Sequence, residues 1–187
     1  AGGVALTVRG SISGSGTVTL TTTVGALALS GDVTGATLDL NAATGINQGD
    51  GSLTADMLLS SLGVTGDVML TGGGGNRIAR LGDFAVSGGN FTLADSVALD
   101  VTGAVSAANL ALSDSAGGTA LTVSGSVAGS GTVGLTASAG ALALNGVVSA
   151  ATLDLNAATG ISQGGGSLTA GTLLSSLGVT GPVALTS

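Results

Sequence analysis

A short phrase recurs eight times along this chain and constrains its fold more than any other feature. The phrase is a glycine, any residue and then an apolar residue, and successive copies are separated by 21, 20, 31, 21, 22, 21 and 20 residues. A period near 20 residues, with turn glycines and alternating apolar positions, is typical of a stacked β-solenoid. The eight apolar positions are Ile12, Val33, Leu53, Phe84, Val105, Val127, Val148 and Leu168.

Two further phrases run in step with the first. One has apolar residues at alternate positions, as in Thr17–Leu20 and Thr152–Leu155. The other opens most coils, as in Ala26–Leu29 and Ala141–Leu144. An apolar residue at every second position indicates a half-buried strand. We therefore predict an all-β parallel solenoid of about eight coils, with roughly 20 residues and three short strands in each coil.

A single coil of this length cannot bury its own apolar side chains. Stacked on the next coil, each strand gains a parallel partner at about 4.8 Å, and each inward Leu, Val or Ile lies on its equivalent. We expect the eight apolar residues of the recurring phrase to form one inward ladder. The segment Ser52–Leu62 holds the best helix formers, but it matches the strand columns, so we predict a strand there.

A longer repeat lies above the coil period. Residues 5–71 align with residues 120–186 without a gap at an offset of 115, and 50 of 67 positions are identical. Because Ile12 and Val127 are five phrases apart, we interpret the duplicated unit as five coils within one β-solenoid spanning 1–187. No capping helix is evident at either end. We therefore expect an interior part of a longer fibre, or a unit whose ends are covered by other copies.

One coil is longer than the others. The step of 31 residues falls in an irregular coil at about 60–76, and we expect about ten of its residues to leave the regular path. Val68–Leu70 is predicted to form an extra strand after a turn at Thr65–Asp67. Loops that project from a rigid scaffold often carry recognition, and Asp67 is therefore one candidate interaction residue. A wider coil or a flap over a strand edge explains the same length.

The ionisable residues exclude several classes of function. All ten acids are Asp, all three bases are Arg, and Lys, Glu, His, Tyr, Trp and Cys do not occur. A formal net charge of −7 argues against binding to nucleic acid, which needs a basic surface, and against docking on anionic lipid. No run of 18 apolar residues occurs, so no membrane span is predicted. We interpret the dispersed acids as a source of solubility.

Motifs for catalysis or metal binding are equally scarce. General acid–base and nucleophilic catalysis would have only Asp, Ser and Thr to use. Arg77, Arg80 and Asp83 form the tightest charged group, which we interpret as a surface ion pair and retain as a candidate interaction site. The run Gly72–Gly75 lacks the acid of a calcium-binding repeat, and no phosphate-loop motif follows it. We therefore predict no enzyme, no metal site and no cofactor.

The stretch from Asn76 to Asp95 carries a more specific signal. Its strings NRIARLGDF and GGNFTLAD, together with the glycine phrases, resemble segments of filamentous-haemagglutinin-like exoproteins and autotransporter passengers of Gram-negative bacteria. This resemblance implies a right-handed parallel β-helix, export through an outer-membrane β-barrel, and display as a fibre. It also implies a role in adhesion or cell–cell contact, with host or cell-surface proteins or glycans as partners.

We therefore expect a structural fibre segment that is secreted or displayed on the cell surface and that is adhesive. Two alternatives remain open. A self-assembling extracellular filament would show coils of adjacent chains stacked end to end. A carbohydrate-active β-helix enzyme would show Asp and Arg side chains clustered along a groove.

Overall fold

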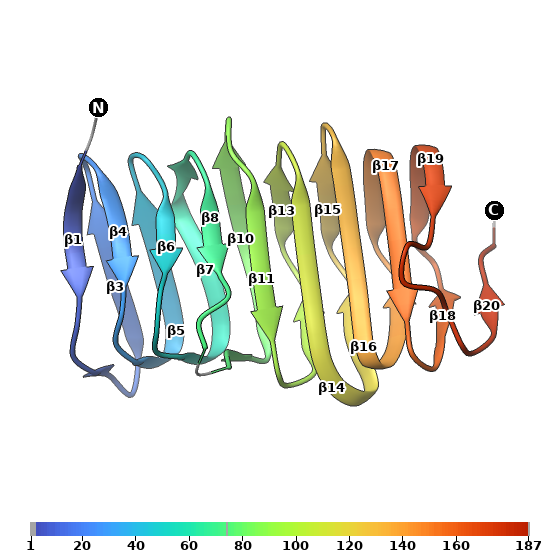
Figure 1. The fold of residues 1–187 in the computed structure, drawn as a ribbon, viewed down its shortest axis with the longest axis horizontal. Coiled ribbons are helices and arrows are strands. Elements are labelled where there is room, and N and C mark those ends of the chain that lie inside the picture. The colour runs from blue at the N-terminus through green and yellow to red at the C-terminus, as the bar shows by residue number, and fades with distance from the viewer. Residues whose placement is uncertain (1–2, 74, 187) are drawn as a thin grey trace.

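The chain forms one parallel β-solenoid of about 8 turns of ~21 residues, with no helix among the residues described. The computed structural model describes residues 3–73 and 75–186, so Gly74 of the irregular coil lies outside the described residues. Figure 1 shows the turns side by side along the long axis, with the two termini at opposite ends of the rod. The predicted all-β parallel solenoid is confirmed.

The strands of successive turns pair in parallel as a single 20-stranded sheet. Several strands, such as β14 and β16, continue around a corner and serve two sides of a turn. The strands are β1 (Val4–Val8), β2 (Ile12–Ser13), β3 (Thr17–Thr22), β4 (Ala26–Leu29), β5 (Val33–Ala42), β6 (Ile46–Gln48), β7 (Leu53–Thr65), β8 (Val68–Leu70), β9 (Arg77–Ile78), β10 (Arg80–Ser87), β11 (Phe91–Asp95), β12 (Leu99–Val101), β13 (Ala104–Ala107), β14 (Leu110–Val123), β15 (Ser126–Gly129), β16 (Thr132–Leu144), β17 (Val147–Ala157), β18 (Gly160–Gln163), β19 (Ser167–Leu174) and β20 (Val183–Ala184).

Two ladders of inward side chains run nearly the whole length of the rod. Each rung comes from one turn, and the register pairs it with the equivalent residue of the next turn. Ladder A consists of Leu6, Leu27, Ile46, Val68, Phe91, Leu110, Val133, Leu153 and Leu173. Ladder B consists of Val18, Leu38, Leu58, Leu81, Val101, Val123, Leu144 and Gln163.

The eight apolar residues of the recurring phrase point inward, but the prediction that they form one ladder is wrong. Six are buried, while Ile12 and Leu168 are partly buried and pack against the core. They form two separate ladders, because Phe84 pairs with Ser60 and not with Leu53. Ladder C is Ile12, Val33 and Leu53. Ladder D is Phe84, Val105, Val127, Val148 and Leu168.

The break arises because the residues of the irregular coil add one more side to the solenoid. After Leu53 the chain continues along β7 to Thr65, and β8 then takes a place in ladder A between β6 and β11. The extra strand predicted at Val68–Leu70 and the strand predicted over Ser52–Leu62 are both confirmed. The expectation that about ten residues leave the regular path is wrong, since β7 and β8 both pair with neighbouring turns.

As a result, the two copies of the duplicated block lie on different sides of the rod. Leu38 belongs to ladder B, whereas its counterpart Leu153 belongs to ladder A. Along ladder B, Leu144 lies five turns beyond Leu38 and Gln163 lies six turns beyond it. The offset of 115 residues therefore exceeds five turns, instead of equalling the five whole turns that the sequence predicts.

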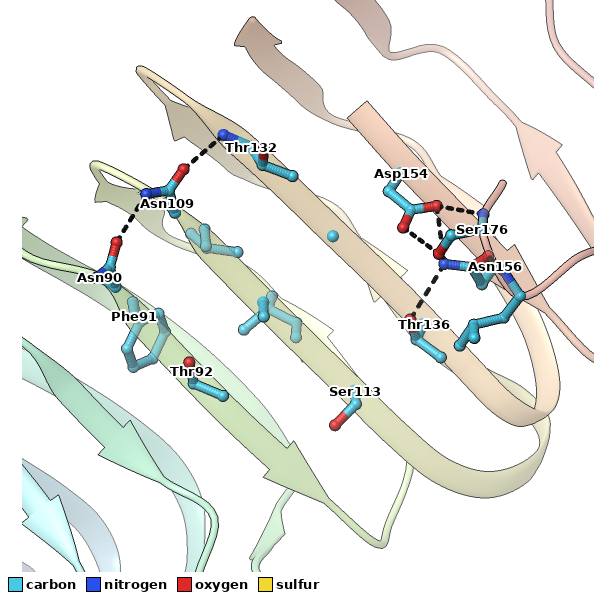
Figure 2. A pocket seen from close by; sticks show the side chains of 15 residues that line it. Asn90, Phe91, Thr92, Asn109, Ser113, Thr132, Thr136, Asp154, Asn156 and Ser176 are labelled. Atoms are coloured by element: carbon cyan, nitrogen blue, oxygen red, sulfur yellow. Dashed lines mark hydrogen bonds between the residues drawn. The ribbon is translucent and has the colours of Figure 1, made fainter. Parts of the chain in front are cut away.

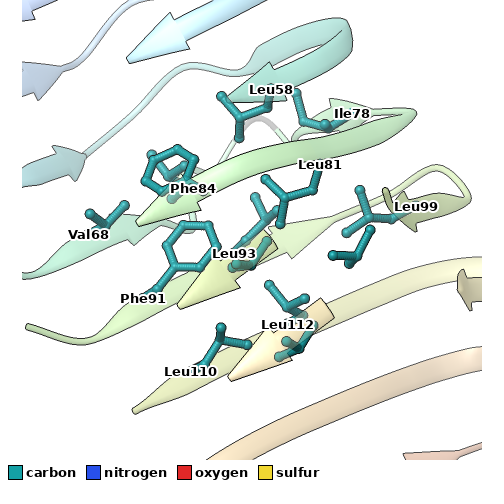
Figure 3. Packing of buried hydrophobic residues seen from close by; sticks show 14 of the residues in the cluster. Leu58, Val68, Ile78, Leu81, Phe84, Phe91, Leu93, Leu99, Leu110 and Leu112 are labelled. Carbon is teal, nitrogen blue, oxygen red and sulfur yellow. The ribbon is translucent and has the colours of Figure 1, made fainter. Parts of the chain in front are cut away.

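The interior is filled by aliphatic side chains, with one aromatic pair at the irregular coil. Phe84 and Phe91 are fully buried and stack with their ring centroids 4.8 Å apart and an interplanar angle of 15°. Figure 3 shows these rings among Leu58, Leu81 and Leu93. Because offset stacked rings attract each other beyond their buried area, this pair fills the core where ladder C ends and ladder D begins.

The glycine of the recurring phrase is needed at the corner of each turn. A Cβ atom added to Gly146 would lie 1.9 Å from the carbonyl oxygen of Gly125, and one added to Gly31 would lie 2.3 Å from that of Gly10. No real Cβ tolerates such a distance. The phrase therefore recurs because successive turns approach each other too closely at this corner for any side chain.

Candidate functional site

A shallow groove on the outer face of β11, β14 and β16 is the best candidate site on the rod. Its volume is about 380 Å³, and Figure 2 shows the polar side chains that surround it. The floor is low because Ala111 and Gly134 occupy paired outward positions between Thr92 and Asp154. Small residues at these two positions create a hollow on an otherwise continuous strand surface.

A ladder of amide side chains forms one rim of the groove. The backbone N–H and Nδ2 of Asn90 donate to Oδ1 of Asp67 at 2.8 and 3.0 Å. Nδ2 of Asn109 donates to Oδ1 of Asn90 at 2.8 Å, and the backbone N–H of Thr132 donates to Oδ1 of Asn109 at 2.8 Å. The candidate residue Asp67 therefore begins an exposed hydrogen-bonded ladder across four turns (Figure 2 shows the last three members).

The far end of the groove is formed by Asp154, Asn156, Ser176 and Leu177. Oδ1 of Asp154 accepts the backbone N–H of Ser176 at 2.8 Å and Nδ2 of Asn156 at 3.0 Å, while its Oδ2 accepts the Ser176 hydroxyl. Burial alone would raise the pKa of Asp154, but the donors of Ser176 and Asn156 outweigh burial and lower it. The carboxylate is thus ionised and already hydrogen-bonded within the chain.

The same network occurs in the first copy of the duplicated block. Oδ1 of Asp39 accepts the backbone N–H of Ser61 at 2.9 Å, and Oδ2 accepts its hydroxyl at 2.7 Å. Oδ1 of Asn41 accepts the hydroxyl of Ser60 at 2.9 Å and the backbone N–H of Leu62 at 2.8 Å. Sequence reasoning missed both networks, although the signal was present, because the Asp and Ser recur at a spacing of 22 residues in both copies.

The charged residues singled out in the sequence have separate surroundings. Arg77 pairs in register with Thr54, and Arg80 pairs with Asp100, and both side chains are exposed. Asp83 accepts the backbone N–H of Ala104 on the next turn at 2.8 Å. No hydrogen bond or ion pair joins Arg77, Arg80 and Asp83 within the described residues.

Most of the Asp residues bond to a neighbouring turn. Five of them accept a backbone N–H that lies 20 to 23 residues further along, at a corner or bend of the following turn. These five residues are Asp32, Asp39, Asp67, Asp83 and Asp154. A carboxylate that accepts backbone N–H groups stabilises those donors more than a neutral acceptor would.

Two further carboxyl groups, Asp95 and Asp114, lie in the interior. They are 5% and 1% exposed and pair with each other in register on adjacent turns. Burial, and to a smaller extent the charge of Asp114, raises the pKa of Asp95 to about 6 against hydrogen bonds from Ile78 and Val97. Burial likewise raises the pKa of Asp114 against hydrogen bonds from Ala116 and Leu99.

Buried amides continue this polar column toward the N-terminal turns. Asn76 forms an isolated parallel bridge with Asp95. Its Nδ2 donates to Oε1 of Gln48 at 3.0 Å, and Nε2 of Gln48 donates to Oδ1 of Asn76 at 2.8 Å. Sequence reasoning missed this column, because nothing in the alternation distinguishes an inward Asp or Asn from an outward one.

The described residues contain no group of three or more His, Cys, Asp or Glu side chains arranged to hold a metal ion. Among the same residues, no helix has the length and apolar character to cross a membrane. No protein-family model, curated protein or solved structure matches the chain. The arrangement of its own residues therefore carries the functional argument.

Proposed function

We propose that this chain is a structural segment of an extracellular or cell-surface fibre that acts in adhesion. The observation that carries the proposal is the use of the polar side chains. The carboxylates of Asp32, Asp39, Asp67, Asp83 and Asp154 and the amides of the groove rim bond to neighbouring turns. Residue types that could have served chemistry instead hold the turns of a long β-solenoid together.

The resemblance of the sequence to filamentous-haemagglutinin-like exoproteins and autotransporter passengers supports the same role. On this proposal the chain crosses the outer membrane through an export barrel and contacts host or cell-surface proteins or glycans along its sides. The enzyme alternative has less support, because Asp154 is the one ionisable residue among those lining the groove and is already hydrogen-bonded.

Adhesion can be tested with microspheres that carry the folded protein at a defined density. The control microspheres carry the Leu38→Asp variant, whose buried carboxylate should unfold the rod. We expect the folded protein alone to attach microspheres to cell monolayers or to immobilised glycans. Equal attachment by the folded and unfolded proteins, or attachment by neither, would overturn the adhesive role.

A self-assembling filament is the second candidate, and one observation favours it. In the last turn described, Leu173, Val183 and Leu185 are exposed, although their counterparts Leu58, Val68 and Leu70 are buried by the next turn. On this proposal a further coil covers them in the assembled fibre. Electron microscopy of the native material should then show rods much longer than roughly 40 Å, the length of eight turns at about 4.8 Å each.

A further inference from the structure

The segment Ser60–Val64 of β7 contains a bulge that turns a leucine toward solvent. Ser60 pairs with Phe84 and Val64 pairs with Val86, so Ser61, Leu62 and Gly63 face the single residue Ala85. Bulged residues leave the ladder and redirect a side chain. Here the redirected side chain is Leu62, which is 74% exposed in the middle of the rod.

Hydrogen bonds from the preceding turn hold this bulge in place. Asn41 accepts the backbone N–H of Leu62 itself, and Asp39 accepts both the backbone N–H and the hydroxyl of Ser61. Gly63 completes the bulge with a φ of 77°, in the left-handed region that glycine adopts without strain. The exposure of Leu62 is therefore fixed by the fold and is not fraying of a strand end.

The duplicated copy holds a second leucine outward in the same way. Leu177 is 76% exposed, and its backbone N–H donates to Asn156 at 2.8 Å. Because the two copies lie on different sides of the rod, Leu177 borders the groove over Gly134, whereas Leu62 projects elsewhere. One chain thus presents both a projecting leucine and a hollow with a leucine on its wall.

We propose that Leu62 of one copy inserts into this groove of a second copy, above Gly134 and against Leu177. The groove suits an aliphatic side chain because Ala111 and Gly134 leave its floor open. It also suits a chain of net charge −7, because its one ionisable lining residue, Asp154, already bonds to Ser176 and Asn156. Charge repulsion is therefore smallest where the two surfaces meet.

This contact joins two different surfaces, so it does not close on a dimer and can align rods side by side. It rests on the proposed structural role and adds lateral bundling to it. One leucine contact is far smaller than a standard interface, so we expect a dissociation constant on the order of 1 mM for an isolated pair. Salt should strengthen the association, because screening weakens the repulsion between rods.

Sedimentation equilibrium of the complete chain over a range of concentration and salt tests the proposal. Leu62→Ser should reduce association about tenfold, and Gly134→Leu should do the same by filling the groove. Both variants should fold, since Leu62 is exposed and a Cβ at Gly134 meets only the carbonyl oxygen of Leu110, at 3.9 Å. The matched control is Val24→Ser, which removes another side chain that is 74% exposed but lies outside the bulge.

Mixing the two variants provides the decisive measurement. The Gly134→Leu chain retains its projecting leucine and the Leu62→Ser chain retains its groove, so the mixture should regain association that neither shows alone. A monomer at about 1 mM in high salt, an effect of Val24→Ser equal to that of Leu62→Ser, or no recovery on mixing would overturn the lateral contact. Loss of lateral association in Leu62→Ser with unchanged rods in electron microscopy would leave the proposed fibre role standing.

Discussion

At the scale of single residues, position relative to the ladders decides what each Asp contributes. Asp39 and Asp154 lie on the outer side of a strand and bond to the following turn, whereas Asp95 and Asp114 lie inside. The short Asp side chain suits the outer role, because its carboxylate reaches the backbone of the next turn without crossing the strand. The alternation of the sequence predicts the outer pair as outward, and gives no signal of the inner pair.

Two neighbouring substitutions separate these contributions. Leu38 is fully buried, so Leu38→Asp places an unpaired carboxylate in the core and should lower the free energy of unfolding by several kcal/mol. Asp39→Ser should cost less, about 1–3 kcal/mol, because it removes hydrogen bonds to Ser61 and Asn41 at a partly exposed site. Chemical denaturation measures both. Equal losses would mean that the two strand faces are wrongly assigned.

The buried carboxyl of Asp95 predicts a pH dependence of stability. Its pKa rises from 3.8 to about 6 on folding, so between these values the folded chain holds a proton that the unfolded chain has lost. The stability contributed by this group is complete below about pH 4 and is lost as the pH rises through about 6. The loss amounts to about 3 kcal/mol at most, and Asp114 acts in the same direction.

Denaturation midpoints measured between about pH 4 and about pH 7 test this dependence. The wild-type midpoint should fall with increasing pH, and Asp95→Asn should flatten the curve by removing one titrating group. Asp56→Asn, at an exposed position, is the matched control and should leave the slope unchanged. A wild-type midpoint that rises over this range would contradict the assignment.

At the scale of the elements, the corner glycines explain why the sequence repeats at all. Each turn contributes a glycine that lies against the backbone of the turn before it, as Gly146 lies against Gly125. The spacing of the phrase therefore predicts the stacking of the turns correctly. It does not predict the bulge at Leu62, because a bulge depends on the hydrogen bonds of Asn41 and Asp39 from another turn.

Substitution of one corner glycine tests this packing. Gly146→Ala should lower the free energy of unfolding by more than 2 kcal/mol, about what a severe clash in a packed interior costs, because the new methyl group would meet the carbonyl oxygen of Gly125. Gly117→Ala is the control, since a Cβ there meets nothing within 4 Å. It should be neutral or slightly stabilising. Thermal unfolding of the two variants decides the matter, and equal midpoints would refute the close approach.

At the scale of the whole molecule, the sequence predicts the parallel stack and its length but not the rotation of one copy against the other. The three phrases keep their order and spacing through both copies, so nothing local marks the change of side. The change becomes visible only in the pairing, where Phe84 meets Ser60 and Leu53 begins no further rung of ladder D. Periodicity reports the order of strands along the chain, whereas side and register depend on how the irregular coil is accommodated.

Disulfide trapping distinguishes the two registers, and the absence of native Cys makes it simple. In the structure Thr54 pairs with Arg77, and parallel neighbours about 4.8 Å apart lie within the Cα separation that a disulfide accepts. A single ladder through Leu53 and Phe84 would instead place Thr54 beside Ala85. The double variant Thr54→Cys with Arg77→Cys should therefore oxidise readily, and Thr54→Cys with Ala85→Cys should remain reduced. Since all three positions are at least partly exposed, the bonds can be assayed in the folded rod, and the reverse result would restore the single ladder and return both copies to the same side.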